Sequence, residues 1–322
     1  MELRWNPVLE TWVMVSAARQ HRPFLPKDQC PFCPGSGKVP DRYDVLLYPN
    51  DFPHLMKNPP EPTIADDELL RVARAFGSCD VVLYSPDHTG SITQLSPEHC
   101  SKLFALWRDR YRAMREREDV KYVLVFENKG EVIGVTIHHP HGQIYSYPYI
   151  PTRPARELDS ARRYWERHDG RCLFCALLEK ETAFERRLVW TSEHFVAYVP
   201  GYSDYPYEVH IYPRRHFGSL LEMSEGEAAD FMAGLQRQVR IYDSLFGFEL
   251  PFIMGFHQEP VDGVDYRYYH FHVEFYPLHR APDRIKYNAG SETGGWAFTN
   301  PSAPEDKAGE LRTISERVKG ES

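Results

Sequence analysis

The chain has 322 residues, of which 42% are apolar, and carries a formal net charge of −8 at pH 7. This length suits one large domain or two of about 150 residues each. The acidic balance argues against a general polyanion-binding surface, so we expect no nucleic-acid partner. No apolar stretch reaches about eighteen residues, and residues 1–5 lack the basic start of a signal peptide, so we expect a cytoplasmic protein without membrane attachment.

The expected elements of the first half begin with a loop at residues 30–37, which is rich in Pro and Gly. Residues 49–62 contain five prolines and predict an ordered loop. Residues 81–84 predict a strand, and residues 98–118 predict a helix with one apolar stripe. Residues 122–126 are apolar without interruption and predict a strand buried on both faces, which leads into a turn at Asn128.

The second half repeats part of this order. Residues 224–246 predict another amphipathic helix, which Ser224 and Glu227 start with a capping box. Residues 300–322 are polar and charged, and they predict either a terminal helix or a frayed end.

The cysteines point to metal. Four of the six form two C-x-x-C pairs, Cys30 with Cys33 and Cys172 with Cys175. In a cytosolic chain such pairs hold metal or do redox work more often than they form disulfides. The redox reading needs a βαβ context, which the Pro/Gly-rich loop at Cys30 does not supply, so zinc is favoured.

An internal repeat strengthens this interpretation. Residues 81–92 align without gaps with residues 209–220, and residues 139–143 align with residues 270–274. Each half therefore has a C-x-x-C pair, then a histidine, then a His-x-His. The repeat predicts two similar domains, residues 1–155 and 156–322, and places both histidines of each His-x-His on one strand face.

Two thiolates and two imidazoles make a closed tetrahedral zinc site. For any one of these residues alone, a satisfied core histidine or a small buried cysteine is the better interpretation, but the repeated order favours ligands. The predicted sets are Cys30, Cys33, His88 and His139 in the first half, and Cys172, Cys175, His216 and His270 in the second.

The segment 136–143 has three histidines and a glutamine. If His139 binds zinc, His141 is available as a nucleophile toward phosphorus, because an imidazole with one nitrogen bonded to a carbonyl presents the other. Gln143 would then hold a phosphoryl oxygen. The zinc would stiffen the strand that carries His141, without a catalytic role of its own.

Ordered motifs from Trp12 to Glu292 carry a family resemblance. They are residues 12–16 (WVMVS), 30–35 (CPFCPG), 50–53 (NDFP), 85–88 (SPDH), 127–130 (ENKG) and 139–143 (HPHGQ). In these motifs the chain resembles the galactose-1-phosphate uridylyltransferases of the histidine-triad superfamily. The resemblance implies an α+β fold with two histidine-triad-like domains, each an antiparallel sheet packed with helices.

The resemblance also implies an activity and a homodimer. UDP-glucose would give its uridylyl group to a histidine, glucose-1-phosphate would leave, and galactose-1-phosphate would take the group to give UDP-galactose. His141 falls at the nucleophile, Gln143 at a phosphoryl contact, and Thr136 where well-known members have a serine that touches the phosphate. The implied substrate-binding residues are Arg19, Arg22, Asn50, Asp51, Asn128, Gly134, Lys286, Gly290 and Glu292, of which both arginines and the last three act across the dimer.

The second metal site has an alternative in this family. Some members lack the second C-x-x-C and bind metal through a glutamate and three histidines, for which Glu157, His257, His270 and His272 are the nearest matches. The cysteines favour the other arrangement, found in a plant relative that transfers adenylyl groups, with zinc or iron as the metal. Glu274 replaces a glutamine beside His272 and would repel phosphate, so this part of the second half is expected to be structural.

Three functions follow as hypotheses. The first is hexose-1-phosphate uridylyl transfer. The second is adenylyl transfer from ADP-glucose to phosphate, suggested by the second cysteine pair. The third is a zinc-stabilised nucleotide-binding protein without turnover, which an intact His141 and Gln143 disfavour. Ser291 replaces an aromatic residue that helps recognise the hexose, which leaves sugar selectivity open.

Overall fold

The computed structural model describes residues 1–17 and 30–319. Its α-helices are α1 (Pro97–Arg115), α2 (Thr152–Arg167), α3 (Leu173–Phe184), α4 (Glu225–Leu245), α5 (Gly290–Gly295) and α6 (Pro304–Lys319). The strands of the first half are β1 (Glu2–Asn6), β2 (Thr11–Val15), β3 (Leu46–Pro49), β4 (Val72–Arg74), β5 (Ser78–Leu83), β6 (Tyr122–Lys129) and β7 (His141–Tyr147). Those of the second half are β8 (Leu188–Thr191), β9 (Phe195–Tyr198), β10 (Val209–Pro213), β11 (Phe252–His257), β12 (His272–Pro277), β13 (His279–Ala281) and β14 (Arg284–Ile285).

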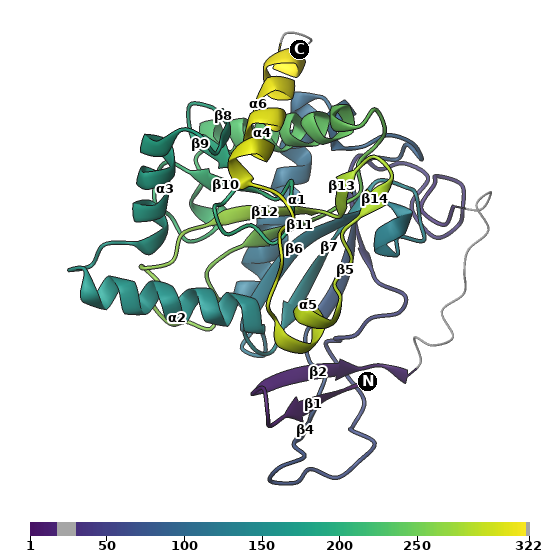
Figure 1. Ribbon diagram of the computed structural model, residues 1–322. Helices are drawn as coiled ribbons and strands as arrows, with labels where there is room; N and C mark the ends of the chain where they lie inside the picture. Colours follow the sequence, from purple (N-terminus) through teal and green to yellow (C-terminus); the bar gives the residue numbers. More distant parts are fainter. Residues whose placement is uncertain (18–29, 320–322) are drawn as a thin grey trace.

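One continuous sheet runs through both halves (Figure 1). Within the described residues it has nine strands in the order β3-β5-β7-β6-β11-β12-β10-β9-β8, and every neighbouring pair is antiparallel. The halves meet where β6 pairs with β11, so the two sheets expected from the sequence are joined edge to edge. The order is mirrored about this pair, as duplication of one unit would give, although the repeat itself stays a prediction.

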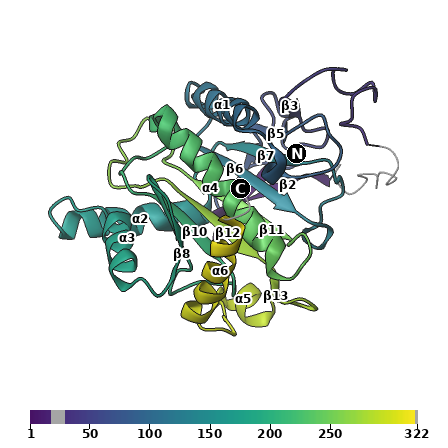
Figure 2. The same cartoon turned by 90° about the horizontal axis from the view of Figure 1, so that it is seen from above.

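Helices α1 and α4 lie against each other across one face of this sheet, and α6 packs on α4 and on the edge strand β8 (Figure 2). The main core fills the space between these helices and the sheet, with Trp107, Phe231 and Phe256 among its buried rings. On the opposite face, α2 and α3 cover the second half, and the small sheet β2-β1-β4 packs beside the first half (Figure 1). This α+β architecture of antiparallel sheet and helices is the predicted fold class.

Most predicted elements are found close to their expected bounds. Helix α1 begins after Ser96, and α4 begins after Ser224, whose side chain and that of Glu227 form the predicted capping box. Residues 304–319 form a helix. The division near residue 155 falls in the first turn of α2. No helix of the described residues is long and apolar enough to cross a bilayer.

Three expectations about strands were wrong. Strand β6 does not turn at Asn128 but continues to Lys129, because Asn128 and Lys129 pair with Ile253 and Phe252 of β11. It is also not buried on both faces, since Leu124 and Phe126 are only half-buried. In addition, His139 and His270 do not lie on strands, because β7 begins only at His141 and β12 only at His272.

Phe256 should be essential to the stability of both halves. It is fully buried on β11, and its ring lies 5.1 Å from that of Trp107 on α1 and 5.5 Å from that of Phe231 on α4. Phe256→Ala is expected to lower the free energy of unfolding by about 3–5 kcal/mol through lost burial and a residual cavity. Urea unfolding measures this, with the exposed Val264→Ala as control. A loss below about 1 kcal/mol would contradict the shared core.

Candidate active site

A cavity of about 670 Å³ lies on the sheet face away from α1 and α4. Its floor is formed by alternate residues of three strands, Val81 of β5, Phe126 and Asn128 of β6, and His141 and Gln143 of β7. The residues between them point into the helix-covered core, as Val82, Val125 and Ile144 do. The cavity therefore uses one face of the strands whose other face builds the core.

Seven residues singled out from the sequence line this cavity together. They come from a loop after β3, from β6, from the segment before β7 and from β7 itself: Asn50, Asp51, Asn128, Gly134, Thr136, His141 and Gln143. Gly134 ends a short 3-10 helix (Glu131–Ile133) with φ of 86°, a left-handed conformation that glycine adopts without strain.

The imidazole of His141 is oriented by its own chain. Its Nδ1 lies 2.7 Å from the carbonyl oxygen of His139. A carbonyl only accepts hydrogen bonds, so Nδ1 carries the proton as the donor, and in the neutral ring Nε2 carries the lone pair. The ring of Phe32 lies beside it, with 6.3 Å between the ring centroids. This tautomer is the one that a nucleophilic or metal-binding Nε2 needs.

Sequence reasoning missed two polar side chains, Lys38 and Tyr48, which contact the predicted Asp51. Lys38 donates a hydrogen bond to Asp51 Oδ2, and the Tyr48 hydroxyl donates to Asp51 Oδ1 at 2.8 Å. The hydrogen bond to Asp51 raises the pKa of Lys38. Lys38 and Tyr48 line the cavity together with Phe32 and Phe52. Lys38 follows a glycine-rich loop whose only recognisable signal was the cysteine pair, so no pattern identified it.

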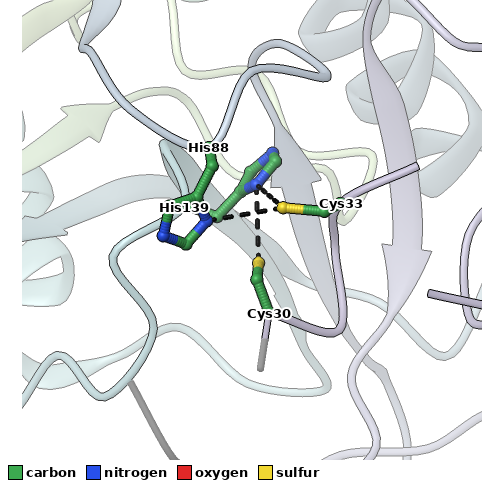
Figure 3. Close-up of side chains that lie close together, drawn as sticks. All are labelled: Cys30, Cys33, His88 and His139. Carbon is green, nitrogen blue, oxygen red and sulfur yellow. Dashed lines mark hydrogen bonds between the residues drawn. The ribbon is translucent and has the colours of Figure 1, made fainter. Parts of the chain in front are cut away.

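The first predicted metal set is assembled (Figure 3). Cys30 Sγ lies 3.6 Å from His139 Nδ1, and Cys33 Sγ lies 3.4 Å from His88 Nδ1 and 3.8 Å from His139 Nδ1. One ligand atom from each of the four residues lies within 4.8 Å of the others. The loop at Cys30, the turn at His88 and the segment before β7 therefore converge on one point.

Backbone groups fix the orientation of this set. His139 Nε2 donates to the Ser85 carbonyl at 2.7 Å, which leaves Nδ1 as the acceptor that faces the sulfurs. Burial lowers the pKa of His139 and so favours the neutral, ligating form. Burial and the neighbouring Cys30 raise the pKa of the Cys33 thiol to about 11. A bound divalent cation reverses such a shift, because ligating thiols are deprotonated.

The second predicted set is built in the same way. Cys175 Sγ lies 3.4 Å from His216 Nδ1 and 3.5 Å from His270 Nδ1, and Cys172 completes the group within 4.8 Å. His216 Nε2 lies 3.0 Å from the carbonyl oxygen of Arg267, which again leaves Nδ1 toward the sulfurs. Both cysteine-histidine groups can therefore bind a metal ion.

A third group lies beside the second. Atoms of Glu157, His257, His272 and Glu274 also approach one another within 4.8 Å. The sequence had suggested His270 in a set with Glu157, His257 and His272, as the alternative to the cysteine site. In the structure His270 belongs to the cysteine group, and Glu274 stands in the fourth place.

Glu274 is the centre of a buried charge network. His257 Nε2 lies 3.1 Å from it, His210 Nε2 3.3 Å and Arg153 Nη1 3.4 Å. Burial opposes its ionisation, but the charges of His210 and His257 hold its pKa well below the usual range. His272 is buried too, at 1% exposure, and lies 3.5 Å from Glu274.

The remaining predicted residues lie elsewhere. Lys286 and Glu292 are buried and pair at 3.4 Å, Gly290 begins α5, and none of the three lines the cavity of its own chain. Arg19 and Arg22 lie outside the described residues. His138 is half-exposed at the surface and pairs with Glu131 at 3.1 Å.

The chain matches two family models in succession. Residues 1–151 match "Galactose-1-phosphate uridyl transferase, N-terminal domain", and residues 157–292 match the C-terminal domain of the same family. The chain belongs to the galactose-1-phosphate uridylyltransferase family. A galactose-1-phosphate uridylyltransferase of Thermotoga maritima is 42% identical over 97% of this chain and 98% of its own length. The Haemophilus influenzae enzyme of the same name is 30% identical over 97% and 94%.

Solved structures agree with this membership. One described as "Structure of uridylyltransferase" superposes with a TM-score of 0.90 at 35% identity, covering 99% of each chain. An ADP-glucose phosphorylase from Arabidopsis thaliana with bound ADP-glucose has a TM-score of 0.74 over 97% of this chain and 98% of its own. At 24% identity, that second likeness concerns the fold alone.

The charge network predicts that the stability of the folded protein depends on Glu274. Glu274→Ala leaves His210 and His257 buried and removes the acceptor that they share with the half-exposed Arg153. Breaking a buried ionic group in this way is expected to cost about 3–5 kcal/mol of unfolding free energy. Urea unfolding tests it against Glu193→Ala, whose side chain is 84% exposed. Equal stability of the two variants would mean that Glu274 does not organise this core.

Proposed function

We propose that the protein is a UDP-glucose:hexose-1-phosphate uridylyltransferase that works through a uridylyl-histidine intermediate. The observation that carries this is the position of His141. Its Nδ1 is bonded to the His139 carbonyl, and its ring lines a cavity that also contains Gln143, Thr136 and Asn128. Family membership and the 42% identity to the Thermotoga maritima enzyme support the same reaction.

The reaction would proceed in two successive displacements at the α-phosphorus. His141 Nε2 attacks the α-phosphorus of UDP-glucose, the N–P bond forms, and the P–O bond to glucose-1-phosphate breaks with the electron pair leaving on that oxygen. A phosphate oxygen of galactose-1-phosphate then attacks the same phosphorus, the N–P bond breaks, and UDP-galactose leaves. The Nδ1–H···O bond to His139 stabilises the imidazole as it gains positive charge in the intermediate.

Neutral donors suit the other predicted roles. Gln143 and Thr136 carry an amide and a hydroxyl that can hydrogen-bond to phosphoryl oxygens, and Asn128 adds a second amide on the same floor. Asn50 and Asp51 are proposed to bind the nucleoside, on the side of the cavity where Phe32 and Phe52 offer apolar surface. The pair of Lys38 and Asp51 supports a polar contact there.

We propose zinc in both cysteine-histidine groups. Two thiols and two Nδ1 atoms within 4.8 Å, with ring orientations fixed by backbone carbonyls, fit the donor set of a closed structural zinc site. Zinc held by the first group would tie the Cys30 loop to the segment before His141. Iron is the alternative metal for the second cysteine-histidine group. The neighbouring group of Glu157, His257, His272 and Glu274 also offers oxygen and nitrogen ligands.

The division into residues 1–155 and 156–322 and the homodimer are also proposals. The mirrored strand order and the two successive family models support the division. Lys286, Gly290 and Glu292 lie away from the cavity of their own chain, as expected for residues that complete the site of a partner.

Adenylyl transfer remains the second candidate, because the second C-x-x-C group is present and assembled. One experiment separates the candidates. The protein is mixed with UDP-glucose or with ADP-glucose, and the adduct is located by peptide mass spectrometry. We expect a UMP adduct on His141, absent in His141→Ala. An AMP adduct instead would favour adenylyl transfer, and no adduct with either sugar nucleotide would favour a binding protein without turnover.

His139→Ala should separate metal binding from catalysis. The variant loses an imidazole of the first group, so we expect about one zinc fewer per chain and a lower free energy of unfolding. His141→Ala should keep full metal content while forming no adduct. Elemental analysis of the purified proteins measures this, with the neighbouring exposed His138→Ala as control. Full zinc content in His139→Ala would remove His139 from the ligands.

A further inference from the structure

The side chain of Tyr84 crosses strand β7, which carries His141, on the face away from the cavity. Tyr84 begins beside Pro140 and reaches under Gly142 to Glu127 on β6, where its hydroxyl donates to Glu127 Oε2 at 2.9 Å. Pairing of Phe126 with Gln143 places Glu127 next to Gly142 on the core face. The hydrogen bond thus joins the residue that follows β5 to strand β6, and it passes beneath Gly142.

Tyr84 is held from several sides. Its backbone N–H donates to the Pro140 carbonyl at 3.1 Å, and its own carbonyl oxygen accepts from His99 Nε2 at 2.7 Å. Its ring is 1% exposed and meets the Trp107 ring edge to face, with 6.0 Å between centroids. A side chain fixed in this way cannot move aside without disturbing the main core.

The close approach explains why residue 142 is a glycine. A Cβ added there would lie 2.4 Å from the Tyr84 hydroxyl oxygen and 3.1 Å from the Phe126 carbonyl oxygen. The backbone of Gly142 is not left-handed, so the requirement comes from space and not from conformation. The strand that carries His141 and Gln143 therefore rests on the Tyr84 hydroxyl.

Within the described part of the chain, the Glu127 carboxyl group accepts one side-chain hydrogen bond, which comes from Tyr84. It is buried between two cavity-lining neighbours, Phe126 and Asn128, whose side chains point the other way. Burial raises its pKa to about 7. Lys129, whose charge acts on Glu127, is bonded to Asp243 at 3.0 Å. The carboxyl group is therefore an acceptor for Tyr84 and not half of an ion pair.

We propose that Tyr84 and Glu127 are positioning residues for group transfer at His141, and that Gly142 is required because their hydrogen bond passes beneath it. The bridge sets the height of β7 between β5 and β6, and with it the distance of His141 and Gln143 from the bound phosphorus. This inference rests on the proposed function for the role of His141. Misplacement by about 1 Å is enough to slow a reaction about a hundredfold.

The test follows the rate of UMP transfer from saturating UDP-glucose to His141 in single-turnover experiments, and UDP-glucose affinity separately. Tyr84→Phe is expected to slow transfer about ten- to a hundredfold while the Kd stays within about twofold. Glu127→Leu should behave alike, and Glu127→Gln, which keeps an acceptor oxygen, should restore transfer. The matched control is Tyr111→Phe, a buried tyrosine whose hydroxyl donates to the Glu259 carbonyl away from the cavity.

A double variant tests the contact itself. Gly142→Ala should slow transfer more than Tyr84→Phe, and adding Tyr84→Phe to it should recover part of the rate, because the clashing oxygen is gone. Such a gain is possible only if the two residues are coupled. Wild-type transfer rates in Tyr84→Phe, or no recovery in the double variant, would overturn the proposal.

A protein that does not transfer UMP can be distinguished from one in which Tyr84 has no positioning role. In that case the wild-type protein forms no adduct, and the position of His141 is followed by NMR of the ¹⁵N-labelled imidazoles. Tyr84→Phe should then shift the His141 ring signals and leave those of His88 in place. Unchanged His141 signals would sink the positioning role whatever reaction the site performs.

Discussion

The alternation of side chains along β7 is the constraint on which the site depends. His141, Gln143 and Tyr145 face the cavity, whereas Gly142 and Ile144 face the helices. Because successive residues of a strand point to opposite faces, whatever fixes the core face also fixes the reactive face. A slip of one residue would bury His141 and expose Ile144. The main core under α1 and α4 therefore determines the position of His141, the proposed nucleophile.

His141 and His272 are oriented alike in the two halves, but their surroundings differ. His272 Nδ1 lies 3.0 Å from the His270 carbonyl oxygen, much as His141 Nδ1 lies 2.7 Å from that of His139. The ring of His272, however, stacks on Tyr212 with 4.7 Å between centroids, and it is almost fully buried. Glu274 occupies the place that Gln143 holds in the first half. The His272 ring therefore offers almost no surface to a phosphate, which supports the expectation of a structural role for this part of the second half.

Sequence alone anticipated the parts whose chemistry limits residue choice. Thiol and imidazole ligands are few, so their repeated order predicted both groups, and the apolar stripe of α1 predicted its buried face. It could not show that Asn128 and Lys129 continue β6, because their partners on β11 lie more than a hundred residues away. Lys38 and Phe32 reach the cavity only through the folded Cys30 loop, and no periodicity marks them.

The buried carboxyl groups of the two halves differ in their partners and therefore in their pKa. Glu274 stays ionised because His210, His257 and Arg153 surround it. Glu127 has a hydroxyl as its partner, and burial raises its pKa to about 7. A carboxyl group whose pKa is raised by folding binds its proton more tightly in the folded state. Its contribution to stability is therefore complete below the pKa of the unfolded state, about 4.3, and is lost as the pH rises toward 7. Below a pH of about 7, where Glu127 keeps its proton, it places no negative charge beneath the floor of a cavity proposed to receive a sugar nucleotide, where a carboxylate would repel phosphate.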